Sequence, residues 1–183
     1  MQLLRSKDGA GEGSETTEVA EVVEVVEGQW LVVEDEHAAP DSAEGKGAAI
    51  TLARYLREPE AWKPNDQSWT VVIAPDDELL DLPAAVLDRS EILIAFPAFT
   101  DGRGYSHAAT LKQRHGFAGT LVAIGDVRRD QLEFMRETGF TAYQITGNDS
   151  VDDMIKSLVE LEMPAHRLYS GAAIDRAAEG QAS

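Results

Sequence analysis

The sequence predicts an α/β fold, with a mostly parallel sheet of about four strands and helices on both faces. Short, nearly continuous apolar runs rich in β-branched residues alternate with amphipathic segments. This alternation is typical of buried parallel strands joined by helices. The chain has 183 residues, of which 43% are apolar. This length suits one domain with a sizeable core.

The N-terminal part is expected to precede the sheet. Residues 1–17 are predicted to be a disordered tail, because their Gly, Ser, Glu and Thr content buries too little apolar surface to offset the ordering entropy. Residues 18–47 are expected to form an acidic extended arm and a loop. Valine-rich segments on both sides of positions 27–30 predict a β-hairpin there. The Glu/Val run is interpreted either as a solubilising acidic tail or as a partner-binding arm.

A single α/β domain is predicted over 48–170, and residues 171–183 are expected to fray. Helices are expected where apolar residues recur at helical spacing, and strands at the most β-branched runs. The first helix would end before Pro59, and Pro83 would interrupt the second. The expected helices span 48–58, 78–87, 105–115, 130–138 and 151–161, and the expected strands span 69–74, 92–96, 120–124 and 141–145.

Composition excludes several classes of protein. The chain has 16 Lys+Arg and 33 Asp+Glu, a formal net charge of −17, and no cysteine. The acidic charge argues against binding to nucleic acid or to anionic membranes. Without cysteine there are no disulfides, thiolate-held clusters or cysteine zinc sites. No apolar run approaches the roughly 20 residues of a membrane-spanning helix, and no secretory signal is seen. The sequence therefore predicts a cytoplasmic protein.

Charge is unevenly distributed along the chain. Residues 1–48 contain 12 acidic and 3 basic side chains, whereas residues 101–145 contain 5 acidic and 6 basic ones. The strongly acidic chain thus has one nearly neutral stretch, and arginine supplies most of its positive charge.

The first candidate loop, 96–106, follows an expected strand, and ligands of open parallel sheets bind beyond the carboxyl ends of the strands. Gly102 and Gly104 permit positive φ, so this backbone can turn tightly. Arg103 lies between them and offers a planar donor fork suited to carboxylate, phosphate or sulfur oxyanions. An ordinary turn, with Asp101 or Ser106 as a helix cap, explains the same residues.

The second candidate loop, 125–131, places Arg128 and Arg129 in the first turn of a helix, where the helix dipole disfavours cations. Such residues indicate a fixed anionic partner, either a ligand or an internal carboxylate, as in an Asp101–Arg129 ion pair. The loop at 146–153 is interpreted as a structural cap, and its acidity would oppose an anion.

Other chemistry is less well supported. The four histidines never form a short ligand pair, so no metal site is predicted, and Ser106 has no evident base. The acidic run at 76–78 is interpreted as the opening of a helix rather than a Mg²⁺ site. Aromatic residues around the first loop either stack a ring or pack the core and a pocket rim. The third glycine of a dinucleotide fingerprint is missing, so no cofactor is evident.

The string at 96–106, together with those at 116–119 and 125–132, resembles the bacterial domain of unknown function 934 family, whose members are often labelled oxidoreductases of sulfite reduction. The resemblance covers about 48–161, and its most specific part is the Asp-Gly-Arg-Gly-Tyr-Ser string. Relatives commonly have cysteine where this chain has Thr138, so the resemblance implies no thiol chemistry here.

The resemblance implies an accessory protein of assimilatory sulfite reduction. Its partners would be sulfite reductase, the electron donor of that enzyme, or a small oxyanion. Two alternatives stay open: a small oxidoreductase holding a phosphate-bearing cofactor such as flavin or NADPH, and an interaction module without a ligand. The expected ligand or anion site comprises Asp101, Gly102, Arg103, Gly104, Tyr105, Ser106, Asp126, Arg129, Asp130 and Gln131.

Overall fold

A computed structural model describes residues 24–27, 30–33, 47–63, 68–144, 151–160, 167–170 and 174–176. The predicted tail at 1–17 lies outside these residues, as does most of the predicted C-terminal tail. The segment Ile174–Arg176 of that second tail is a strand.

The structure is an α/β fold in which every strand pairing is parallel. The four predicted strands are present as β4 to β7. The strand order is β1-β8-β7-β6-β5-β4-β3-β2-β9. The strands are β1 Glu24–Glu27, β2 Trp30–Val33, β3 Gly47–Thr51, β4 Trp69–Ile73, β5 Glu91–Phe96, β6 Thr120–Gly125, β7 Ala142–Gln144, β8 Arg167–Ser170 and β9 Ile174–Arg176.

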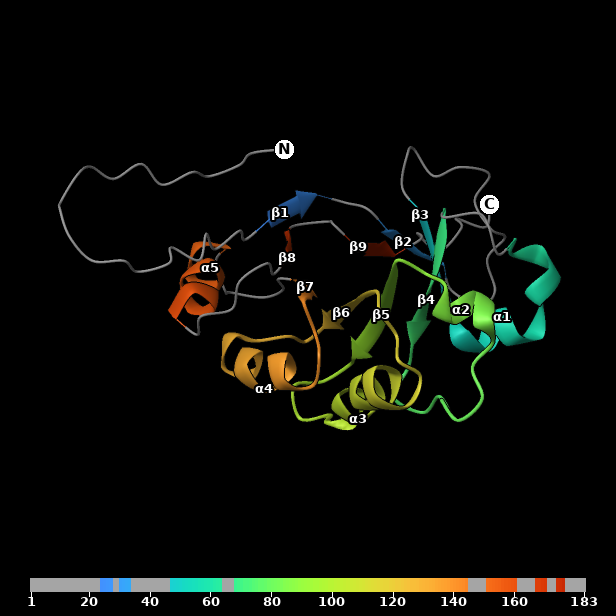
Figure 1. Cartoon of the computed structure of the whole chain (residues 1–183). Helices are drawn as coiled ribbons and strands as arrows, with labels where there is room; N and C mark the ends of the chain where they lie inside the picture. The colour runs from blue at the N-terminus through green and yellow to red at the C-terminus, as the bar shows by residue number, and fades with distance from the viewer. Residues whose placement is uncertain are drawn as a thin grey trace, which may run out of the picture.

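The sheet closes into a ring (Figure 1). In an open sheet with strands about 4.8 Å apart, the seven steps from β1 to β2 would cover about 34 Å. Three chain steps from Glu27 to Trp30 span at most about 11 Å, so the two ends of the order must meet. At this seam Glu24 pairs with Arg167 and Trp30 pairs with Ile174.

The two strands expected on either side of positions 27–30 are present as β1 and β2. Their partners are other strands, however: β8 for β1, and β3 and β9 for β2. These pairings are parallel, whereas a hairpin is antiparallel. The chain therefore crosses the seam instead of folding back on itself.

The helices lie outside the ring (Figure 1). They pack on one face of the sheet, in a core where strand side chains such as Ile94 meet helix side chains such as Leu111. The prediction of helices on both faces is corrected here. The helices are α1 Leu52–Arg57, α2 Ala84–Leu87, α3 Arg103–Ala109, which continues as a π-helical turn at Thr110–Arg114, α4 Leu132–Glu137 and α5 Val151–Glu160.

The second face of the sheet forms the interior of the ring. Its buried apolar cluster contains residues of β2 to β7 and none from a described helix. Because the sheet curves, this face is buried against the opposite side of the ring. Strands that are apolar on both faces are compatible with a second face covered by helices and with one enclosed by the sheet itself. The indole N–H of Trp30 donates to Oε2 of buried Glu91 at 2.8 Å, which ties β2 to β5 across the interior.

One predicted helix begins later than expected. Residues 47–51, expected at the start of the helix 48–58, form β3 between β2 and β4, with Ala49 and Ile50 fully buried. A short alanine-rich run fits a helix or a buried strand, and periodicity alone does not separate the two. Thr51 then caps α1 by accepting a hydrogen bond from the Arg54 N–H at 3.1 Å.

Candidate functional site

The candidate site lies at the carboxyl ends of β4, β5 and β6. In a closed parallel barrel the strand-to-helix loops converge at this end. The loops involved span 74–83, 97–102 and 126–128. The first of these did not belong to the predicted site.

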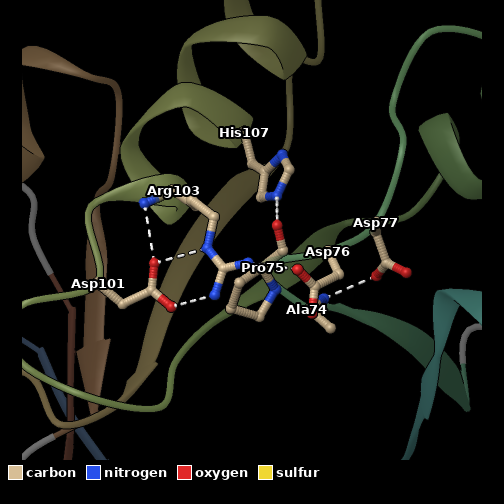
Figure 2. A network of polar contacts seen from close by, with 7 residues as sticks. All are labelled: Ala74, Pro75, Asp76, Asp77, Asp101, Arg103 and His107. Atoms are coloured by element: carbon tan, nitrogen blue, oxygen red, sulfur yellow. Dashed lines mark hydrogen bonds and ion pairs between the residues drawn. The ribbon is translucent and has the colours of Figure 1, made fainter.

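Arg103, at the start of α3, lies between two aspartates (Figure 2). Its Nε donates to Asp101 Oδ1 at 2.9 Å and its Nη2 donates to Asp101 Oδ2 at 2.7 Å. Its Nη1 donates to Asp76 Oδ1. The Asp101 side chain is 14% exposed, that of Arg103 53% and that of Asp76 90%. The guanidinium is therefore held from the protein side by Asp101 and reaches solvent beside Asp76.

These contacts change the acidity of the pair. Hydrogen bonds from Arg103 lower the pKa of the Asp101 carboxyl. The same hydrogen bonds raise the pKa of Arg103. Both side chains are therefore charged at neutral pH.

Asp76 is carried by a well-defined turn (Figure 2). The Asp77 carboxylate accepts from the Ala74 N–H at 2.7 Å, and the Asp77 N–H donates to the Ala74 carbonyl at 3.1 Å. His107 Nε2 lies 3.1 Å from the carbonyl oxygen of Pro75. The acidic run at 76–78 thus forms this turn and does not open a helix, because helix α2 begins only after Pro83.

The second loop contains a similar pair. Arg128 donates to both carboxylate oxygens of Asp126, at 3.0 and 3.2 Å, and its guanidinium carbon lies 4.7 Å from the centre of the Phe99 ring. The Phe99 N–H also donates to Asp126, at 3.0 Å. The arginine and then this N–H lower the pKa of Asp126. The internal pairs are thus Arg103 with Asp101 and Arg128 with Asp126, in place of the proposed Asp101–Arg129 pair.

Gln131 joins the two predicted loops. Its side-chain oxygen accepts from the Arg128 N–H at 3.0 Å, and its amide nitrogen donates to the Phe99 carbonyl at 3.2 Å. Gln131 is buried, whereas the neighbouring Arg129 and Asp130 are exposed. Of the predicted residues of the second loop, Asp126 and Gln131 therefore contact the first loop.

The glycines act differently from the prediction. Gly102 has a φ of −84°, and Gly104 lies within helix α3. Gly104 is needed for space, because a Cβ there would lie 2.6 Å from the buried Phe96 ring. Among the glycines of the two candidate loops, Gly125 is the one with positive φ, at +100°. A Cβ on Gly125 would lie 2.3 Å from the carbonyl oxygen of Phe96.

The aromatic side chains divide between core and surface. Phe96 is fully buried, and Tyr105 packs between it and Phe134, with ring centroids 5.1 and 4.7 Å away. Burial raises the pKa of Tyr105. Phe134 is 53% exposed, and Ser106 is exposed on α3. Of the two interpretations given for these aromatic residues, stacking on a ligand ring or packing in the core, Phe96 therefore fits core packing.

Sequence reasoning left out Asp76, Arg128, Phe99 and His107 from the site. Asp76 carried a usable signal, because it follows a predicted strand, as Asp101 and Asp126 do. Within the described ranges, no group of three or more His, Cys, Asp or Glu could hold a metal ion. None of the helices in those ranges is long and apolar enough to cross a bilayer.

The comparisons with known proteins agree with the resemblance noted in the sequence. The family described as "Bacterial protein of unknown function (DUF934)" matches residues 70–177, more than half of the chain. No curated protein and no solved structure matches. The matched region contains β4 without its first residue, β5 to β9, and all three loops of the site. The chain therefore belongs to the DUF934 family.

Proposed function

We propose that this chain is a cytoplasmic accessory protein of assimilatory sulfite reduction, and that it binds a small oxyanion at the loops 96–106 and 125–131. The main support is Arg103, whose guanidinium Asp101 holds in place and whose side chain is still 53% exposed. The resemblance of the loop strings to a family associated with sulfite reduction supplies the metabolic context.

The guanidinium is arranged for a second anion. An arginine has five N–H donors, and Asp101 uses one on Nε and one on Nη2. Of the three N–H groups that remain, one on Nη1 and one on Nη2 lie along the outer edge of the guanidinium, and Asp76 accepts from Nη1 there. A sulfur oxyanion can accept two parallel hydrogen bonds from such an edge.

The second loop supports the same site. Gln131 holds the first loop through the Phe99 carbonyl, and Phe99 contacts both Arg128 and Asp126. The two loops therefore form one connected rim. Because these contacts hold the loops in place, an arginine on them loses less conformational entropy when it binds a ligand.

Charge supports a second role, docking to a basic surface of sulfite reductase or its electron donor. The segments 74–78, 97–103 and 125–131 together contain six acidic and three basic side chains. A net negative rim attracts a basic protein and accelerates encounter at low salt. Such docking would weaken as the ionic strength rises.

The oxyanion site is tested by thermal unfolding of the purified protein with sulfite, sulfate, flavin mononucleotide or NADPH. We expect sulfite or sulfate to raise the melting temperature. Arg103→Ala should remove this response and retain the fold, because the side chain is half exposed. Arg114→Ala is the matched control, since this exposed arginine lies at the far end of the same helical segment. An Arg103→Ala protein that keeps the full response contradicts the proposed site.

The same preparation separates the alternatives. Yellow absorbance, or a shift with flavin mononucleotide or NADPH only, supports the oxidoreductase. Co-purification with sulfite reductase that weakens at high salt supports docking. A protein with neither response supports an interaction module without a ligand.

A further inference from the structure

The outer edge of the Arg103 guanidinium is occupied by a carboxylate of the chain itself. Asp101 takes the Nε side, and Asp76 accepts from Nη1 (Figure 2). Arg103 is thus placed between an inner carboxylate that is mostly buried and an outer one that is almost fully exposed. The two carboxylates therefore differ in how easily they can be replaced.

We propose that Asp76 is a specificity-determining residue: an internal competitor that occupies the ligand position on Arg103 and admits only oxyanions able to displace it. This inference rests on the proposed oxyanion site. The ligand class is a small oxyanion that presents two oxygens on one edge, such as sulfite, sulfate, phosphate or a carboxylate.

The backbone that carries Asp76 is held in place. The turn is closed by the hydrogen bonds between Ala74 and Asp77, and His107 from α3 lies within hydrogen-bond distance of the Pro75 carbonyl. Asp76 therefore leaves Arg103 by rotation of its own side chain, while its backbone stays at the rim. When the ligand dissociates, the carboxylate is close enough to return at once.

The Asp76 contact is weak enough to be replaced. Its side chain is 90% exposed, and exposed ion pairs contribute little because water and salt screen both charges. A ligand that accepts from both Nη1 and Nη2 exchanges one contact for two. A monatomic anion such as chloride meets both N–H groups with a single atom, so its hydrogen bonds are bent and weaker, and the competition with Asp76 selects against it.

The test compares Asp76→Asn with the wild type by titration calorimetry, using sulfite, sulfate and acetate at an ionic strength of 0.15 M set with chloride. At this ionic strength charges separated by more than about 8 Å are largely screened. We expect Asp76→Asn to bind these oxyanions about two- to fivefold more tightly, the factor that corresponds to an exposed ion pair. Glu78→Gln is the matched control, because it removes the same charge from an exposed residue of the same segment.

The outcomes are distinguishable. If the wild type binds sulfite and Asp76→Asn binds it no more tightly, Asp76 is not a competitor, and the oxyanion site stands. If the affinity of Glu78→Gln for the oxyanions rises as much as that of Asp76→Asn, the gain comes from removing a negative charge that repels any anion, and the inference is overturned. If neither the wild type nor Asp76→Asn binds any of the oxyanions, both the inference and the proposed site fail. Tighter binding by Asp76→Asn that is lost in the double variant with Arg103→Ala establishes the competition.

Discussion

Replacing Gly125 by alanine tests how tightly the second loop is built against β5. Gly125 is the last residue of β6 and has a φ of +100°. It lies so close to the Phe96 carbonyl that a Cβ would be 2.3 Å from the carbonyl oxygen. The following Asp126 N–H donates to that carbonyl at 2.8 Å. An alanine Cβ would therefore meet backbone that is already paired, in a conformation that L residues rarely adopt.

Two costs add in this variant. Holding a non-glycine residue in a sparsely populated backbone region costs about 1–3 kcal/mol. Forcing a methyl group into packed atoms costs about 1–3 kcal/mol more. We therefore expect Gly125→Ala to lower the free energy of unfolding by about 2–6 kcal/mol, against a total of about 5–15 kcal/mol for a typical domain.

Gly116→Ala is the matched control. Gly116 also has a positive φ, +64°, but a Cβ there would have nothing within 4 Å. Only the backbone cost applies, about 1–2 kcal/mol. Urea unfolding of the three proteins measures the difference. Equal losses of stability in the two variants would refute the argument that close approach to Phe96 requires glycine at position 125.

Two further predictions concern the rim. Gln131→Leu should lower the free energy of unfolding by about 1–3 kcal/mol, because it leaves the Arg128 N–H and the Phe99 carbonyl without their side-chain partner. Urea unfolding measures this loss, and an unchanged midpoint contradicts it. Acid should also destabilise the protein. The pKa values of Asp101 and Asp126 are lowered in the folded state, so their stabilisation is complete above the unfolded value near 4 and is lost as the pH falls through the folded values. Thermal unfolding from pH 7 to pH 2 should show a smaller loss in the Asp101→Asn/Asp126→Asn variant; identical profiles would contradict the role of these pairs.

The elements that the sequence predicted best are those with the strongest local pattern. The strands β4 to β7 are runs of buried β-branched and apolar residues, and α5 is amphipathic over its whole length. A run such as that of β5, with Ile92, Leu93 and Ile94 fully buried, indicates a strand covered on both faces. It does not indicate whether helices or the rest of a closed sheet cover the second face.

Part of the site was also predictable. Strand ends followed by Asp, Gly and Arg indicated the two loops that the structure brings together, and Gln131, one of the predicted site residues, bonds to both of them. The partners of the arginines were not predictable. Asp76 lies 27 positions before Arg103, and no local pattern connects the two residues. Likewise, the roles of Gly104 and Gly125 depend on Phe96, which approaches them only in the folded chain.

The sequence by itself determined the α/β class, the segments that become central strands, and the family, because these depend on local composition and short strings. Tertiary structure alone decided the closure of the ring, the side of the sheet that the helices cover, and the pairing of Arg103 with Asp76 and Asp101. The physical reason is that these features arise between segments distant in the chain. Burial and charge pairing select their partners only when the backbone has brought them together.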